Sequence, residues 1–328
     1  MTVTTTANWL PYALPLRTPW QTSRGRVMTR HGRLLRLGGE DGLIGWGDCA
    51  PLPEFGIDEN RAVAFAKECA QLDLTAQRAA QPLDAWLSGN PPVRTLSVNA
   101  SLGKLTASSA AEIGAACAAG FKVLKLKVGS APVADEIRHL CRLATVLPAD
   151  CRLRLDANGA WNIANARDFL AACRDLPVDA CEEPLAVPEP DELARLQAAV
   201  PFVLAVDESL DLLGAAFFQH PPVRRIVIKP ARLGGLLAAM AIARRARAAG
   251  VETVISSALE SSCGLLACAH LAAAAAPTAI HGLATASWFV SDTGTPPLIQ
   301  HGQLILPGKP GLGFHWAGDS APAFARPA

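Results

Sequence analysis

Two lysines stand inside an otherwise apolar stretch, FKVLKLKVGS, at residues 121–130. Side chains two positions apart on a strand share a face, so Lys125 and Lys127 point together while Leu124 and Leu126 point to the other side. On its own, such a pair is typical of a half-exposed strand, because lysine is rarely buried without a partner. The pair indicates chemistry only if other charged residues face it.

Acids and a further lysine close the next four strand-like runs. These residues are Asp156, Glu182, Asp207 and Lys229. Together with Lys127 they follow one another at intervals of 22 to 29 residues, the length of one strand–helix repeat. Each acid alone could be a solvated strand end or a helix N-cap. In a parallel barrel, however, the carboxyl ends of the strands meet at one face, where such enzymes place their active sites. Five charged groups in this register therefore favour one shared site.

The three acids predict a bound cation. Carboxylates that converge without a counter-charge repel one another, and an oxygen-only set without histidine or cysteine suits Mg²⁺, for which Mn²⁺ could substitute. Lysines on both sides of such a site can remove and return a proton next to a substrate carboxylate. The residues therefore predict a metal-assisted enzyme that acts on a small-molecule carboxylate.

From about residue 95 the chain alternates short strand-like runs with alanine-rich helical segments. The strand-like runs lie at residues 95–101, 122–128, 151–157, 178–184, 202–208, 224–230, 251–257 and 278–284. Eight such repeats predict a parallel (β/α)₈ barrel of the TIM type. An open doubly wound sheet is the alternative, but no glycine-rich nucleotide-binding motif follows any of these runs.

The first 93 residues break this rhythm and predict an α+β capping domain. The Glu-Asp-Gly sequence at residues 40–42 predicts a hairpin turn. Segments 21–27 and 50–58 are expected to be loops that close over the barrel mouth, where Arg24 could meet an anionic substrate or simply be solvated. The predicted organisation is a cap at 1–93, completed by 300–328, and a catalytic barrel at 94–299.

Composition limits the partners. The 328 residues are half hydrophobic and carry a formal net charge of +1 with both signs mixed along the chain, so neither nucleic acid nor an anionic membrane surface is an expected partner. The chain starts without a basic leader and no apolar run is long enough to span a bilayer, which predicts a cytoplasmic protein. The nine cysteines lack metal-site or disulfide spacing. The oligomeric state is not predicted.

The chain resembles the enolase superfamily, in particular its muconate-cycloisomerase subgroup and, within that, the o-succinylbenzoate synthases. The resemblance rests on Lys-x-Lys at 125–127, Asp-x-Asn at 156–158, Glu-Glu-Pro from 182, Asp-Glu-Ser from 207 and Lys-Pro from 229. The segments ISSALESSCGL at 255–265 and GWGDCAPLP at 45–53 are also similar to segments of the synthases. Several synthases have serine where this chain has Ala258.

The resemblance implies a role for each of these residues. Asp156, Glu182 and Asp207 would bind Mg²⁺, Lys127 would be the general base and Lys229 the opposing cation. Lys125 would assist Lys127 through its like charge. Contacts to the substrate are expected from three more residues, namely Asn158, Ser256 and Arg154.

The implied reaction is the dehydration of 2-succinyl-6-hydroxy-2,4-cyclohexadiene-1-carboxylate to o-succinylbenzoate in menaquinone biosynthesis. A racemase of N-acylamino acids or an epimerase of dipeptides needs the same acids and lysines and remains the alternative. A barrel that only binds ligands is least favoured, because it would be expected to lose at least one of these residues.

Overall fold

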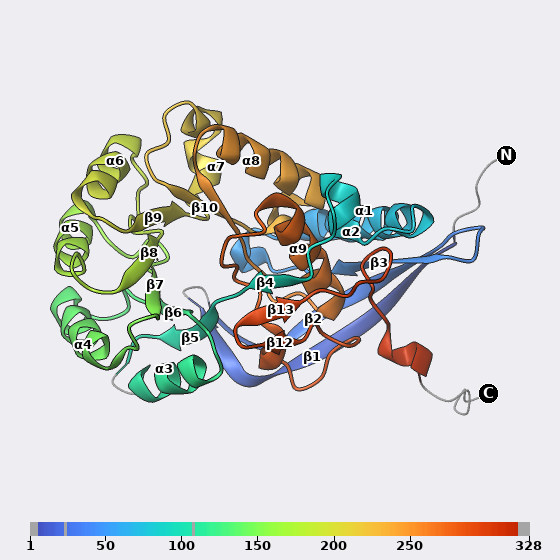
Figure 1. The fold of residues 1–328 in the computed structure, drawn as a ribbon, viewed down its shortest axis with the longest axis horizontal. Coiled ribbons are helices and arrows are strands. Elements are labelled where there is room, and N and C mark those ends of the chain that lie inside the picture. The colour runs from blue at the N-terminus through green and yellow to red at the C-terminus, as the bar shows by residue number, and fades with distance from the viewer. Residues whose placement is uncertain (1–5, 23–24, 107–108, 321–328) are drawn as a thin grey trace.

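The computed structural model describes residues 6–22, 25–106 and 109–320. A curled, parallel seven-stranded sheet surrounded by helices forms the barrel, and an antiparallel three-stranded sheet with two helices lies beside it (Figure 1). A second, small antiparallel sheet of three short strands joins the two parts. The predicted fold class, a modified TIM-type barrel with an α+β cap, is confirmed.

The barrel strands are short and follow one another in space in chain order. They are β5 (Ala100–Lys104), β6 (Val123–Lys127), β7 (Arg152–Asp156), β8 (Val178–Glu182), β9 (Val203–Val206), β10 (Arg225–Ile228) and β11 (Glu252–Ile255). In the backbone register, Lys127 of β6 lies opposite Asp156 of β7, and Asp156 lies opposite Glu182 of β8. The charged strand ends are therefore in register.

The two outermost predicted strands differ from expectation. Residues 278–284 form single bridges, one between His281 and Val98 and one between Gly282 and Ser256. The predicted run at 95–101 splits into β4 (Thr95–Ser97) and β5, because β4 pairs with β13 (Gln303–Ile305) near the end of the chain. The barrel thus closes through a few hydrogen bonds around residues 281–282 rather than through a full eighth strand.

Helices connect successive barrel strands. They are α3 (Ser109–Ala118), α4 (Val133–Val146), α5 (Ile163–Ala172), α6 (Pro190–Ala199), α7 (Ser209–Leu213), α8 (Leu236–Ala248) and α9 (Ser262–Ala275). Short 3₁₀ turns add η2 (Ala215–Phe218), η3 (Pro230–Leu233), η4 (Ala286–Trp288) and η5 (Ala317–Ser320). Helix α9 is apolar on nearly every side because it packs between the barrel and the cap.

The cap consists of β1 (Thr6–Thr22), β2 (Gly25–Gly38), β3 (Ile44–Cys49), η1 (Pro53–Phe55), α1 (Glu59–Arg78) and α2 (Leu83–Ser88). The predicted turn at 40–42 joins β2 to β3, and Gly42 adopts φ 77°, which glycine tolerates best. The pairing of β1 with β2 is irregular between Pro15 and Trp20, because the partner of Pro15 is Thr29 and that of Trp20 is Val27.

The end of the described chain returns to the cap, as expected. Strand β12 (Ile299–Gln300) turns into β13, and further on Gly311 O accepts from Leu83 N at 2.9 Å. Leu312 N donates to the Asp73 carboxylate at the end of this path, at 2.8 Å. The domain boundaries at 1–93, 94–299 and 300–328 stay a prediction.

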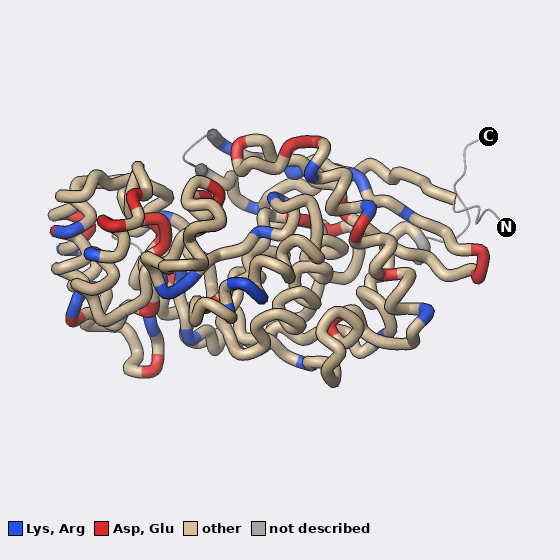
Figure 2. The backbone as a smooth tube through the Cα atoms, turned by 90° about the horizontal axis from the view of Figure 1, so that it is seen from above, with Lys and Arg blue, Asp and Glu red and all other residues tan. Residues whose placement is uncertain are grey.

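Acidic and basic residues are interspersed along the backbone trace (Figure 2). Among residues 6–22, 25–106 and 109–320, no helix combines the length and the apolar character that crossing a bilayer demands.

Candidate active site

A cavity at the carboxyl end of the barrel brings most of the predicted residues together. Lys127 and Asp156 are the last residues of β6 and β7, and Lys229 directly follows β10. The cavity is lined by these three and by Lys125, Asn158 and Ser256, among others. Glu182, at the end of β8, and Asp207, just after β9, lie buried behind this lining.

Lys125 is held between two carboxylates. Its Nζ lies 2.9 Å from Asp156 Oδ2 and 2.8 Å from Glu182 Oε2, and each acid is only 3% exposed. Burial alone would lower the pKa of Lys125, but the charges of Asp156 and Glu182 outweigh it and hold that pKa above the ordinary value. For Asp156, burial is likewise outweighed by Lys125 and Lys127, so the pKa of its carboxyl is lowered. Lys125 is therefore a fixed positive charge.

Lys127 has a neutral partner instead. Its Nζ donates to Asn158 Oδ1 at 2.9 Å, and no described carboxylate forms an ion pair with it. Asn158 has φ 46°, a left-handed conformation that asparagine tolerates, and its N–H donates to Asp156 Oδ1 at 3.1 Å. The strand end thus orients Asn158, which in turn positions Lys127 in the cavity.

Lys229 lies in the same cavity and pairs with Asp207. Asp207 Oδ1 also accepts from Arg232 Nη1 at 3.2 Å. Burial lowers the pKa of Lys229 to about 8, with the Glu182 carboxylate opposing that shift. Lys229 therefore carries a charge that is less strongly held than that of Lys125.

The second glutamate of the Glu-Glu-Pro motif has a different task. Glu183 adopts φ 47°, and its Oε1 accepts from Asp207 N at 2.5 Å and from Ser209 N at 2.8 Å. Burial raises the pKa of Glu183 to about 7. Glu182 thus faces Lys125, whereas Glu183 fixes the loop that carries Asp207, a role that the sequence pattern alone did not indicate.

The chemistry of the three acids fits a hard cation such as Mg²⁺, since all donors are buried carboxylate oxygens from adjacent strands. Within the described residues, no three His, Cys, Asp or Glu side chains converge in a geometry ready for a metal ion. Lys125 and Lys229 engage the acids instead. A cation would therefore have to draw carboxylate oxygens away from ammonium groups.

The loop after β11 presents few free polar groups. The N–H groups of Ser256, Ser257, Ala258 and Leu259 all donate within the protein. Ser257 Oγ donates to Glu260 Oε2 at 2.6 Å. Ser256 Oγ has only long contacts, 3.4 and 3.5 Å, to carbonyl oxygens. Of the two serines in the predicted segment that line the cavity, Ser256 is therefore the freer to meet a ligand.

Aromatic side chains from the cap and barrel cover the cavity. Trp20 in β1 stacks on Phe55 in η1 with ring centroids 4.9 Å apart, and it meets Trp288 edge-on at 6.2 Å. All three line the cavity. Phe55 lies in the segment 50–58 that was expected to be a loop over the mouth. The other expected loop, 21–27, differs, because residues 21–22 end β1 and residues 25–27 begin β2. No sequence pattern singled out the three rings. Arg24 lies outside the described residues.

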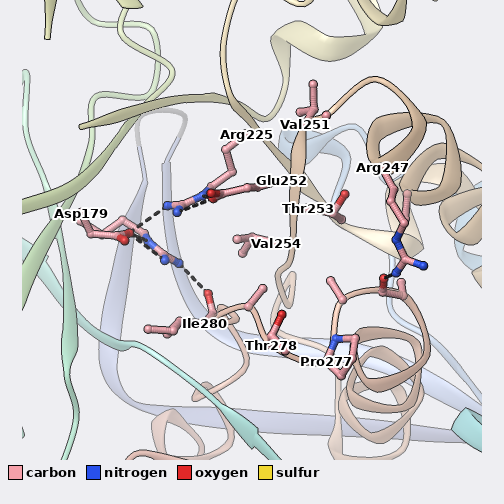
Figure 3. A pocket seen from close by; sticks show the side chains of 16 residues that line it. Asp179, Arg225, Arg247, Val251, Glu252, Thr253, Val254, Pro277, Thr278 and Ile280 are labelled. Atoms are coloured by element: carbon pink, nitrogen blue, oxygen red, sulfur yellow. Dashed lines mark hydrogen bonds and ion pairs between the residues drawn. The ribbon is translucent and has the colours of Figure 1, made fainter. Parts of the chain in front are cut away.

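Arg154 requires a correction, because the structure does not bring it to this cavity. Its guanidinium binds Asp179, with Nη2 at 2.8 Å from Oδ2, and its Nη1 donates to Ile280 O at 2.9 Å. These groups line another cavity, of about 680 Å³, at the amino ends of the strands, where Asp179 also meets Arg225 (Figure 3). Arg154 shares the strand face of Asp156 but lies nearer the amino end.

Comparison with known proteins places this fold and site in a family. The family model "Enolase C-terminal domain-like" matches residues 108–320. The o-succinylbenzoate synthase of Thermobifida fusca is 32% identical, with 89% of this chain and 85% of the relative covered. That of Pectobacterium atrosepticum is 31% identical, with 84% and 88% covered. The chain belongs to the enolase superfamily and is an enzyme.

Relatives with other activities are also similar. The L-Ala-D/L-Glu epimerase of Bacillus subtilis is 26% identical, with 92% of this chain and 94% of the relative covered. An N-succinyl Arg/Lys racemase from Bacillus cereus has a TM-score of 0.87 at 22% identity, covering 98% of this chain and 97% of its own. A dipeptide epimerase from Cytophaga hutchinsonii, solved with Mg and a dipeptide, has a TM-score of 0.85 at 21% identity, with 97% of both chains covered. These two structures show the fold.

Proposed function

We propose that the protein is an o-succinylbenzoate synthase, which dehydrates 2-succinyl-6-hydroxy-2,4-cyclohexadiene-1-carboxylate. The observation that carries this proposal is that the three lysines have different partners. Lys125 and Lys229 form ion pairs with acids, whereas Lys127 donates only to the amide oxygen of Asn158. Because no described carboxylate forms an ion pair with Lys127, its Nζ is free to approach the carbon that loses the proton. The synthases among the relatives support the choice of substrate.

In this mechanism Lys127 takes the proton from the carbon next to the ring carboxylate. The electron pair of that C–H bond first spreads onto the carboxylate as an enediolate, and it then forms the new ring double bond as the neighbouring C–O bond breaks. Lys127 returns its proton to the departing hydroxide, which leaves as water. Lys229 stays protonated and faces the charge that develops on the carboxylate. Asp156, Glu182 and Asp207 would hold Mg²⁺, which would supply further positive charge beside the substrate carboxylate.

The aromatic cover suits such a substrate. Trp20, Phe55 and Trp288 present ring faces and edges to the cavity, which favours a flat, conjugated ring. They would also keep water from the reacting carbon. The proposal places the enzyme in menaquinone biosynthesis and in the cytoplasm, and both assignments stay predictions.

A racemase or epimerase is the second candidate. It is favoured by the placement of Lys127 and Lys229 in one cavity, because racemisation needs a proton-transferring group on each face of the carbon. The similar epimerase of Bacillus subtilis supports it as well.

Two assays with purified protein and Mg²⁺ test the proposal. Dehydration is followed by absorbance with the cyclohexadiene substrate, and deuterium uptake into both enantiomers of an N-succinylamino acid is followed by NMR in D₂O. We expect efficient dehydration, lowered by about 10² to 10⁴-fold in Lys127→Ala. Rapid exchange with both enantiomers together with negligible dehydration would establish the second candidate instead.

A further inference from the structure

A second cavity, here called the vestibule, adjoins the catalytic cavity. It has a volume of about 560 Å³ and shares Trp20, Ser101, Lys125, Lys127 and Trp288 with the catalytic cavity. Because these five residues line both spaces, a ligand that holds its reacting carbon beside Lys127 can extend a chain into the vestibule. The charged residues that line only the vestibule are Arg17, Lys104 and Glu112.

An irregular stretch of β1 in the cap places Arg17 at the vestibule. The register of β1 shifts between Pro15 and Trp20, so the segment containing Arg17 leaves the regular pairing with β2. Arg17 Nε donates to the backbone oxygen of Ser287 at 3.1 Å, beside η4 of the barrel. Its Nη1 and Nη2 make no hydrogen bond to another described residue. The guanidinium is thus anchored at one nitrogen and open at two.

Lys104 stands at the end of β5 on the barrel side of the vestibule. Its Cα is paired with that of Lys127 on β6, after a register irregularity that begins at Ser101. Lys104 is exposed, and its Nζ has no hydrogen bond or ion pair within the described chain. The cap and the barrel therefore each contribute one uncommitted cation to the vestibule.

The charge balance of the vestibule is positive. Lys125 is neutralised by its buried acids. Glu112, at the start of α3, is the one acid among the described residues that line the vestibule. Arg17 and Lys104 outnumber it, and Lys127 adds a further basic group at the inner end.

The loop after β11, which lines the catalytic cavity, offers little to a second anion. The backbone N–H groups of residues 256–259 are already bonded, and Ala258 and Leu259 present apolar side chains there. Of the side-chain hydroxyls of residues 256–259, that of Ser256 has only long contacts. The exposed cations Arg17 and Lys104 line the vestibule instead.

We infer that the vestibule is a binding subsite for a second carboxylate of the substrate, with Arg17 and Lys104 as the residues that select dianionic over monoanionic substrates. This inference rests on the proposed function in so far as the reacting carboxylate sits beside Lys127. It goes beyond that function by assigning the distal carboxylate to a cation from each part of the molecule. Charges exposed in this way act through screened Coulomb attraction, so the preference should weaken with salt.

Ligand binding measured by calorimetry in the presence of Mg²⁺ tests the subsite. The probes are two pairs that differ only in the distal carboxylate: o-succinylbenzoate against 2-butanoylbenzoate, and N-succinylphenylalanine against N-butanoylphenylalanine. For at least one pair, we expect the dianion to bind about 10-fold or more tightly than the monoanion at low salt. The Arg17→Gln, Lys104→Gln double variant should reduce this preference to about 2-fold or less. Arg17→Lys and Lys104→Arg should keep most of it.

Matched controls are Lys122→Gln and Arg195→Gln, which remove exposed cations away from both cavities. They should leave the preference unchanged. A preference that survives in the double variant, equal loss in the controls, or equal binding of both members of both pairs would overturn the inference. Because binding is measured without turnover, a protein that fails to dehydrate its proposed substrate can still show the preference with the N-succinyl pair.

Discussion

At the scale of single residues, the site depends on how three lysines are paired. Lys125 is held by Asp156 and Glu182, Lys229 by Asp207, and Lys127 by the neutral Asn158. Identical side chains therefore have different electrostatic surroundings within one cavity. The difference comes from the strand ends on which their partners lie.

Substitution of Lys229 by arginine separates the two candidate reactions. Arginine keeps the positive charge that faces the enediolate but does not exchange protons near neutral pH. Lys229→Arg should therefore retain dehydration within about 10-fold and lose any racemisation. The measurement is dehydration by absorbance beside deuterium exchange by NMR. Loss of dehydration to the level of Lys127→Ala would mean that the Lys229 proton itself moves.

Residue types and their spacing were sufficient to predict that Lys127, Asp156, Glu182, Asp207 and Lys229 lie at or just after strand ends, which share one face of a barrel. Their roles in binding a metal and in catalysis stay predictions. Residue types and spacing were insufficient for Arg154. Alternation places Arg154 on the face of Asp156 but says nothing of depth along the barrel. The register between β7 and β8 also shifts at this point, skipping Asp179, which binds Arg154 at the amino end.

At the scale of elements, all three cap strands hold the loop after β11. Tyr12 in β1 donates to Asp48 Oδ1 in β3 at 2.7 Å, and Ser261 N donates to Asp48 Oδ2 at 2.8 Å. In β2, Arg30 Nε donates to Leu259 O at 3.0 Å. Leu259 has φ 60°, which is unusual for leucine and needs such support. No local sequence pattern indicates the two contacts to the loop, because each joins residues more than 200 positions apart.

The buried guanidinium of Arg30 should be important for both stability and substrate binding. It also donates to Pro51 O and Ala50 O, at 2.8 and 2.9 Å. Arg30→Met leaves these carbonyl groups unsatisfied and should cost about 2–4 kcal/mol in the free energy of unfolding. Arg30→Lys replaces the planar guanidinium, with its several N–H donors, by a single ammonium group. Because this loosens the loop after β11, it should raise KM about 5-fold with a smaller change in kcat.

Urea unfolding and steady-state kinetics give these values. Arg33→Lys is the matched control, since Arg33 lies on the same strand and pairs with Glu59 at the surface. If Arg30→Lys behaves like Arg33→Lys, the loop does not depend on the cap strand.

The closing segment of the barrel carries a histidine that should make stability depend on pH. His281 is fully buried, its Nδ1 accepts from Ile255 N at 3.0 Å and its Nε2 donates to Ala276 O at 3.0 Å. It serves as a hydrogen-bonded core residue. Burial, aided by the charge of Arg154, lowers the pKa of His281 to about 4.

The sign of the effect follows from proton uptake. Between pH 4 and 6.5 the unfolded chain binds a proton at this residue that the folded chain does not, so folding stability should fall as the pH falls through this window. The loss should reach about 3 kcal/mol near pH 4. His281→Asn, which keeps an acceptor for Ile255 N, should flatten this part of the pH dependence. Urea unfolding at pH 7.0 and 5.0 gives the free energy of unfolding of the wild type and of His281→Asn. An equal change between the two pH values in both proteins would contradict the role given to His281.

At the scale of the whole molecule, the cap and the barrel complete one site between them. The barrel supplies the acids and lysines, while Trp20 and Phe55 come from cap segments. The barrel architecture followed from repeated strand–helix patterns, but the placement of the cap rings depends on an irregular register in β1 and on packing between distant segments. Sequence patterns predict elements from neighbouring residues, so they do not predict contacts between segments that are far apart in the chain.

Metal binding should couple this site to the stability of the whole fold. Asp156, Glu182 and Asp207 come together only in the folded barrel, so a cation that they hold binds the native state and not the unfolded chain. Saturation at about 100 times the Kd should add about 2.7 kcal/mol of stability. For a chain of this size, the thermal midpoint should rise by a few degrees with Mg²⁺ and less with an equal ionic strength of NaCl.

EDTA should abolish turnover, and Mg²⁺ or Mn²⁺ should restore it. Asp207→Asn should weaken the Mg²⁺-dependent rise, whereas Asp150→Asn, at an exposed acid that pairs with Lys122, should leave it intact. Full turnover after exhaustive chelation, together with a midpoint indifferent to Mg²⁺, would rule out the metal, because the carboxylates would then serve only as partners of Lys125 and Lys229.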